Sequence, residues 1–177
     1  AGLLRESRQY ASRAQAIIVT KCPSQVDTIR QQEMIAAIQQ YAPHSPVYFT
    51  TVKYAALAGI FDQTKPETTA KKFIVVTGIA NAEPMVKHLN NLGVISTHLD
   101  FPDHHDYKKK DVKKIVNLLK SNEDAILVTT EKDAVKLRAF ETELSSCPCY
   151  FLPIEISFLD REEEFLDQLQ KSAVLSD

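Results

Sequence analysis

Glycine is scarce in this sequence. The 177 residues contain four glycines, which is about 2% against the ~7% of an average protein. They are Gly2, Gly59, Gly78 and Gly93. No two of them have the spacing of a Walker phosphate loop or of a dinucleotide-binding fingerprint. The chain therefore contains neither of these phosphate-binding loops.

Tryptophan and long apolar runs are absent as well. No run approaches the ~18 apolar residues of a membrane-spanning helix, and the first 15 residues lack the apolar segment of a signal peptide. The net charge of −2 gives no general reason to expect nucleic-acid binding. With 44% hydrophobic and 25% charged residues, the composition is that of an ordinary globular protein.

Cysteine is limited to Cys22, Cys147 and Cys149. An odd number argues against a disulfide framework, and one C-x-C pair without a second pair or a nearby histidine does not complete a zinc site. We interpret the three as reduced thiols.

Short β-branched runs alternate with amphipathic stretches along the whole chain. The pattern predicts strands at 16–20, 46–52, 73–77, 94–99, 125–129 and 149–158. The helices between them are expected at 24–41, 81–93, 108–120, from 130 onward and at 160–173. In the first helix, a Ser24-x-x-Asp27 capping box opens a stripe formed by Val26, Ile29, Ile35 and Ile38. Alternation at this spacing predicts an α/β fold with parallel sheets covered by helices.

Parallel sheets place functional groups just beyond the carboxyl ends of their strands. Four segments qualify: Thr20–Cys22, Thr77–Ile79, Asp100–His105 and Thr129–Asp133. The third segment has the highest density of ionisable side chains, because Asp103 and Asp106 flank His104 and His105. A carboxylate beside an imidazole can fix its tautomer and raise its basicity, which suits removal of a hydroxyl proton. A plain helix entry with partly exposed histidines is the alternative.

The other segments have two interpretations each. In the Thr129–Asp133 segment, Thr130-x-x-Asp133 is explained by helix capping. The alternative is that Lys132 binds a phosphate or acidic group at the helix N-terminus. Lys21 could lie over a nucleotide ring, although Pro23 replaces the base-reading aspartate of the related motif. A basic helix face is either simply solvated or contacts anionic lipid; it consists of Lys108, Lys109, Lys110, Lys113 and Lys114.

Taken together, these segments resemble the tetraacyldisaccharide 4′-kinases, the lipid A kinases of Gram-negative bacteria. The resemblance covers about residues 2 to 160. Its most specific part is Phe101-Pro102-Asp103-His104 followed by Thr129-Thr130-Glu131-Lys132-Asp133-Ala134-Val135. Supporting segments are Gly2–Glu6, Ala16–Lys21 and Thr77–Asn81, although Asn81–Pro84 departs from the commoner G-N-P form.

The resemblance implies a Rossmann-like, P-loop kinase architecture of two α/β lobes. We expect residues 1–52 to be the C-terminal remnant of the nucleotide-binding lobe, 53–72 a linker, and 73–177 a second, parallel-sheet α/β/α lobe. The family's phosphate loop and metal-binding acids lie upstream of the matched segments. We therefore expect a C-terminal fragment that is inactive alone and self-associates through exposed strand edges.

The resemblance also implies the chemistry. The family transfers a phosphoryl group from ATP, with Mg²⁺, to the 4′-hydroxyl of the lipid A disaccharide precursor at the cytoplasmic face of the inner membrane. His104 and Asp103 are the implied catalytic residues. Arg5, Glu6 and Lys21 are expected on the nucleotide side, and His105, Lys132 and Asp133 in the substrate cleft.

Two other functions fit parts of the sequence. Asp103-His104-His105 spells the D-H-H signature of metal-dependent phosphoesterases, but that family also needs D-x-D motifs for two Mn²⁺ ions, and no D-x-D occurs here. A non-catalytic α/β binding or regulatory module is the second alternative.

Overall fold

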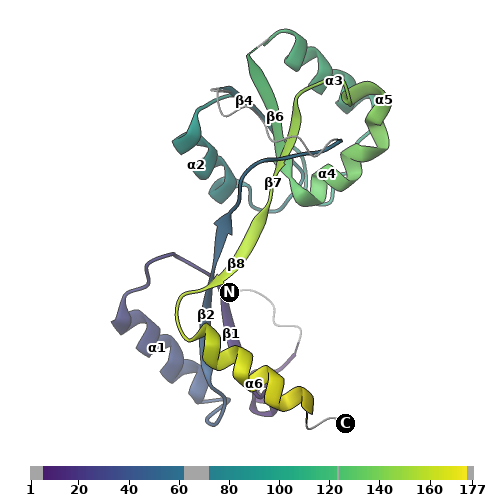
Figure 1. Ribbon diagram of the computed structural model, residues 1–177. Coiled ribbons are helices and arrows are strands. Elements are labelled where there is room, and N and C mark those ends of the chain that lie inside the picture. The colour runs from purple at the N-terminus through teal and green to yellow at the C-terminus, as the bar shows by residue number, and fades with distance from the viewer. Residues whose placement is uncertain (1–5, 62–71, 123, 175–177) are drawn as a thin grey trace. The chain divides into compact units, whose positions relative to one another are not determined.

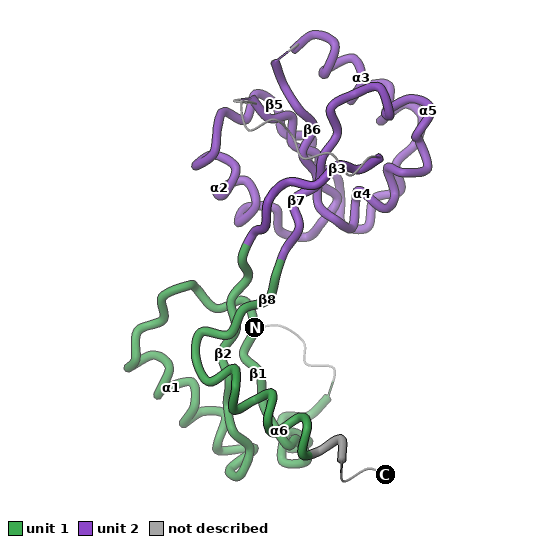
Figure 2. The backbone as a smooth tube through the Cα atoms, viewed as in Figure 1, with its two compact units in different colours: residues 1–53, 155–177 green, residues 54–154 purple. Residues whose placement is uncertain are grey.

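The computed structural model describes residues 6–61, 72–122 and 124–174. The chain divides into two compact units (Figure 2). Unit 1 comprises Ala1–Lys53 and Glu155–Asp177, and unit 2 comprises Tyr54–Ile154. Within the described residues, no helix is both long and apolar enough to cross a membrane.

Unit 1 is built on a three-stranded sheet in the order β1-β2-β8. Strand β1 (Ile17–Cys22) runs parallel to β2 (Val47–Tyr54), and β8 is Ile154–Phe158. Its helices are η1 (Arg8–Arg13), α1 (Thr28–Gln39) and α6 (Glu162–Val174).

The first helix differs from expectation in two details. Asp27, not Ser24, caps α1, because its Oδ1 accepts the N–H of Ile29 at 3.2 Å. The expected core position Ile29 is 65% exposed, whereas Val26, Ile35 and Ile38 do pack against the buried Cys22, Val47 and Phe49. Met34, which the predicted stripe did not include, also packs against this cluster.

Unit 2 is a three-layer α/β/α structure (Figure 1). Its sheet has the order β3-β7-β6-β4-β5, in which only β3 is antiparallel. The strands are β3 (Ala58–Gly59), β4 (Lys72–Thr77), β5 (Val94–Asp100), β6 (Ala125–Thr130) and β7 (Cys149–Leu152). The helices are α2 (Glu83–Leu92), α3 (Lys109–Lys120), α4 (Glu131–Leu137), η2 (Arg138–Phe140) and α5 (Glu141–Leu144).

The two faces of this sheet carry separate cores. Phe73 and Val75 of β4 point toward Met85 and Leu89 of α2. Alternate positions, Ile74 and Val76, face the other side, in a cluster with Val112, Ile115 and Leu119 of α3 and Leu137 of α4. Because both faces are covered, β4 and β6 are continuous apolar runs rather than alternating ones. This arrangement confirms the expected parallel-sheet α/β class.

The division of the chain differs from the expected one at two places. Residues 155–177 belong to unit 1, not to the second lobe, because Pro153 separates β7 from β8 and β8 joins the sheet of unit 1. Part of the expected linker, 54–61, belongs to unit 2 and contributes the buried Ile60 to its core. The remainder of the linker, 62–71, lies outside the described residues.

An aromatic cluster attaches α6 to unit 1. The buried Tyr48 of β2 meets Phe165 of α6 edge-on at 5.1 Å between ring centroids, and Phe158 lies 5.0 Å from Phe165. Tyr48 also donates its hydroxyl to Gln168 at 3.0 Å, and the Arg161 guanidinium lies 5.0 Å from the Tyr48 ring centroid. The C-terminal helix α6 therefore completes the core of unit 1 around β2, which lies in the N-terminal part of the chain.

This packing predicts a unit-specific loss of stability. We expect Phe165→Ala to destabilise unit 1 by about 2 kcal/mol, since it removes a half-buried aromatic side chain. Hydrogen exchange should show faster exchange of β2 amides and unchanged protection of β4. Leu166→Ala, at a 47% exposed neighbour, is the matched control and should change neither. Faster exchange in β4 but not in β2 would contradict the assignment of α6 to unit 1.

Candidate functional site

The carboxyl ends of β4, β5 and β6 meet at one edge of the sheet in unit 2, because the three strands are parallel and adjacent. Three of the four predicted segments therefore come together there: Thr77–Ile79, Asp100–His105 and Thr129–Asp133. The fourth, Thr20–Cys22, lies in unit 1.

Asp133 is the buried centre of this edge, at 1% exposure. Its Oδ2 accepts the backbone N–H of Gly78 at 2.9 Å and the hydroxyl of Thr130 at 2.7 Å. Its own N–H donates to Thr130 Oγ1 at 3.1 Å, which confirms the predicted cap. The Asp133 side chain thus also joins the ends of β4 and β6, a link that capping patterns do not reveal.

Tyr107 lies on the other side of the same carboxylate and was missed at the sequence level. Burial, followed by the charge of Asp133, raises its pKa well above the usual value of 10, so the phenol stays protonated. Space here is small: a β-carbon on residue 78 would lie 3.0 Å from Asp133 Oδ1 and 3.4 Å from the Tyr107 hydroxyl oxygen. Any larger residue at position 78 would force these neighbours to shift by a few tenths of an ångström.

His105 is held by its neighbours on every side. Its ring stacks on Phe101 at 4.4 Å between centroids, and its Nε2 lies 3.1 Å from Oδ2 of the buried Asp111. Its backbone oxygen accepts from Lys136 Nζ at 2.8 Å. The His105 imidazole therefore supports the loop from within.

Asp111 connects this histidine to helix α3. Burial alone raises its pKa, but the N–H of Lys108, at 3.0 Å, and His105 more than offset that effect and leave the pKa below its usual value. The Asp111 carboxylate thus caps the N-terminus of α3 and binds His105 at the same time.

His104, unlike His105, points into solvent: its side chain is 73% exposed. Its backbone has φ 60°, in the left-handed region. Its N–H donates to Gly78 O and to Asp103 Oδ1, both at 3.0 Å. Its Nε2 lies 3.6 Å from Asp103 Oδ2. A non-glycine residue held in this conformation costs of order 1–3 kcal/mol, and such residues cluster at functional sites.

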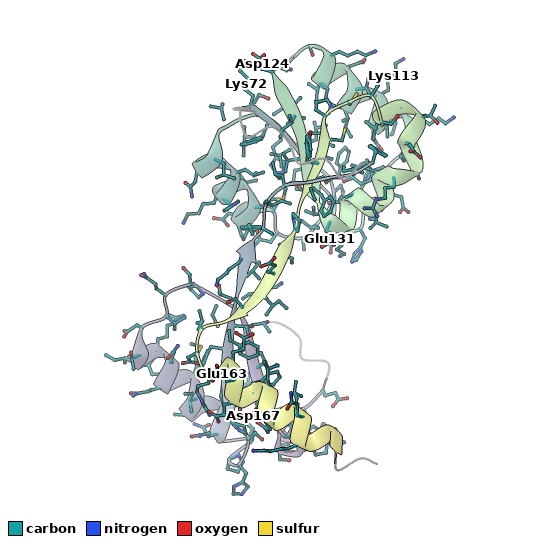
Figure 3. All side chains as sticks on the ribbon, in the orientation of Figure 1. Lys72, Lys113, Asp124, Glu131, Glu163 and Asp167 are labelled. Carbon is teal, nitrogen blue, oxygen red and sulfur yellow. The ribbon has the colours of Figure 1, made fainter. Side chains whose placement is uncertain are left out.

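The remaining predicted residues are less constrained. Glu131, labelled in Figure 3, begins α4. The following residue, Lys132, is exposed, and its side chain forms no hydrogen bond or ion pair with other described residues. Glu6 is paired with Arg13 at 3.7 Å, and Lys21 is exposed with φ 59°. Both belong to unit 1. Arg5 lies outside the described residues.

The described residues bring together no group of three histidine, cysteine, aspartate or glutamate side chains suited to a metal ion. His105 Nε2 is engaged by Asp111 while His104 is exposed to solvent, so the two histidines do not act as one ligand pair. This geometry disfavours the D-H-H phosphoesterase interpretation.

Comparison with known proteins identifies the family. The family model described as tetraacyldisaccharide-1-P 4′-kinase (LpxK) matches residues 1–173. The chain belongs to this family. The tetraacyldisaccharide 4′-kinase of Cytophaga hutchinsonii is 31% identical over 98% of this chain and 49% of the relative. That of Parabacteroides distasonis is 33% identical over 97% of the chain and 49% of the relative.

A solved kinase shares the fold. The crystal structure of LpxK from Aquifex aeolicus in complex with ATP aligns with a TM-score of 0.57 and 19% identity, over 95% of this chain and 45% of that one. The chain thus spans about half the length of the LpxK relatives that it matches.

The close approach at Gly78 predicts a specific defect in this LpxK chain. We expect Gly78→Ala to lower the free energy of unfolding by about 1–3 kcal/mol, because the new methyl group overpacks the contact with Asp133. Gly93→Ala is the control. Gly93 has φ 179°, extended backbone that alanine adopts freely, so denaturant unfolding should show little change or a small gain. Equal stability of the two variants would show that the contact does not constrain residue 78.

Proposed function

We propose that this chain forms part of an ATP-dependent kinase that phosphorylates the 4′-hydroxyl of a tetraacyldisaccharide 1-phosphate, a lipid A precursor. The family membership over residues 1–173 supports this assignment. We further propose that the chain is inactive alone, since its sequence contains no Walker phosphate loop.

The geometry of His104 carries the proposal. Phosphoryl transfer to a hydroxyl requires a proton acceptor and accurate positioning. His104 presents an exposed imidazole at the carboxyl edge of a parallel sheet, with the Asp103 carboxylate 3.6 Å from Nε2. In the proposed mechanism His104 assists removal of the acceptor proton, directly or by supporting a carboxylate elsewhere in the enzyme, and Asp103 stabilises the imidazolium.

The buried groups behind His104 act as positioning residues in this mechanism. Asp133 binds the N–H of Gly78, and the carbonyl of Gly78 binds the N–H of His104. His105 fixes the next residue of the same loop through Asp111. Lys132, exposed beside this edge, is proposed to attract an anionic group of the substrate.

ATP would supply the transferred phosphoryl group and Mg²⁺ would neutralise its charge. The described residues do not form a complete binding site for ATP or for Mg²⁺, because they contain neither a phosphate loop nor a three-ligand metal cluster. Within this chain we propose only that Arg5, Glu6 and Lys21 face the nucleotide.

The acceptor named by the family carries four acyl groups, so it resides in a lipid bilayer. We therefore propose that the kinase works as a peripheral protein at the cytoplasmic face of the inner membrane.

Substitution of His104 tests the proposal. In a family kinase that includes this chain, we expect His104→Gly to lower kcat by about 100-fold or more, since the proton-transfer group is lost. The same change should leave unfolding of this chain unchanged or slightly more difficult, because glycine relieves the left-handed backbone. His44→Ala, an exposed histidine in unit 1, is the control and should keep full activity. An unchanged kcat in His104→Gly would exclude His104 from the reaction.

A further inference from the structure

One face of helix α3 carries positive charge almost without interruption. Its exposed lysines, here called the α3 lysine face, are Lys109, Lys110, Lys113, Lys114 and Lys120. At 3.6 residues per turn they occupy about 140° of the helix circumference. The opposite side holds the buried Val112, Ile115 and Leu119. Figure 3 labels Lys113 on this helix.

Among the described residues, no acidic side chain forms an ion pair with this face. The ion pairs found there include none of the five lysines. The acid within α3 itself, Asp111, is buried and bonded to His105, and of the five lysines only the charge of Lys110 contributes to the lowering of its pKa. On the neighbouring α5, Glu141 and Glu143 are exposed and form no ion pair with the lysine face. The local charge is therefore strongly positive, although the whole chain has a net charge of −2.

Helix stability alone does not explain this pattern. Lys109 with Lys113, and Lys110 with Lys114, stand four residues apart on the same surface, where like charges repel and destabilise a helix. A helix that needed only a solvated face would gain from mixing acids with lysines. The repeated positive charge therefore indicates an anionic partner.

We propose that the α3 lysine face docks unit 2 on the anionic surface of a lipid bilayer. This inference rests on the proposed function, because the family's acceptor is a tetraacylated, phosphorylated lipid. Lys109 follows His104 by five residues in the same unit, so docking through α3 brings the reactive loop to the bilayer that holds the acceptor. The attraction is electrostatic and weakens as ionic strength rises.

Vesicle binding of the full chain tests the proposal without ATP or disaccharide. The probe is a vesicle of 30% phosphatidylglycerol in phosphatidylcholine, compared with phosphatidylcholine alone, at ~0.1 M salt where the Debye length is about 10 Å. We expect sedimentation with anionic vesicles only. Replacing Lys109, Lys110, Lys113 and Lys114 by Gln should weaken binding about 10²–10³-fold, at about 1 kcal/mol per lysine near the surface.

The control removes the same charge elsewhere. Replacing Arg30, Lys53, Lys87 and Lys171 by Gln, all exposed positions outside α3, should weaken binding far less, with circular dichroism confirming that both variants fold. Equal loss in both variants, or failure of the native chain to bind anionic vesicles, would overturn the proposal. Competition by inorganic phosphate beyond that of chloride at equal ionic strength would instead indicate a discrete phosphate site and also overturn it. Because no reaction is measured, a failed kinase assay leaves this result unaffected.

Discussion

The buried carboxylate of Asp133 is the constraint on which the carboxyl edge of unit 2 depends. A carboxylate at 1% exposure is costly unless it is hydrogen-bonded. Here the N–H of Gly78 and the hydroxyl of Thr130 both donate to its Oδ2, while its Oδ1 has no hydrogen-bond partner among the described residues. The carboxylate bridges the loop after β4 to Thr130, the residue whose hydroxyl oxygen caps α4, and the carbonyl of the same Gly78 accepts the N–H of His104. One buried charge thus connects two strands to the exposed imidazole.

A second buried carboxylate extends this support to the other side of the loop. Asp111 opens α3 and holds His105, so the helix that carries the lysine face and the loop that carries His104 share one anchor. Of two adjacent histidines, His105 is partly buried and fixed by Asp111, and His104 is left exposed in a left-handed conformation. The strain of that conformation is borne by the contacts around Gly78 and Asp103 rather than relieved by a glycine.

Much of this could be predicted from the sequence, because the decisive signals were local. Strand and helix periodicity located the sheet of unit 2, the Thr130-Asp133 cap was correct, and the parallel-strand rule brought three of the four segments to one edge. What could not be predicted depends on contacts between distant residues. The return of β8 and α6 to unit 1 rests on Tyr48 meeting Phe165, and the link from Asp133 to Gly78 spans 55 residues. Ile29 fitted the helical stripe yet is exposed, since periodicity does not reveal how wide a face the sheet covers.

A double-mutant cycle of kcat in a family kinase that includes this chain tests the central claim most directly. Asp133→Asn and His104→Ala are measured singly and together, with KM determined for each. If Asp133 acts by positioning His104, Asp133→Asn lowers kcat when His104 is present and has little further effect in the His104→Ala background, which is the non-additivity expected of coupled residues. Fully additive losses in kcat would contradict the claim and would show that Asp133 does not work through His104.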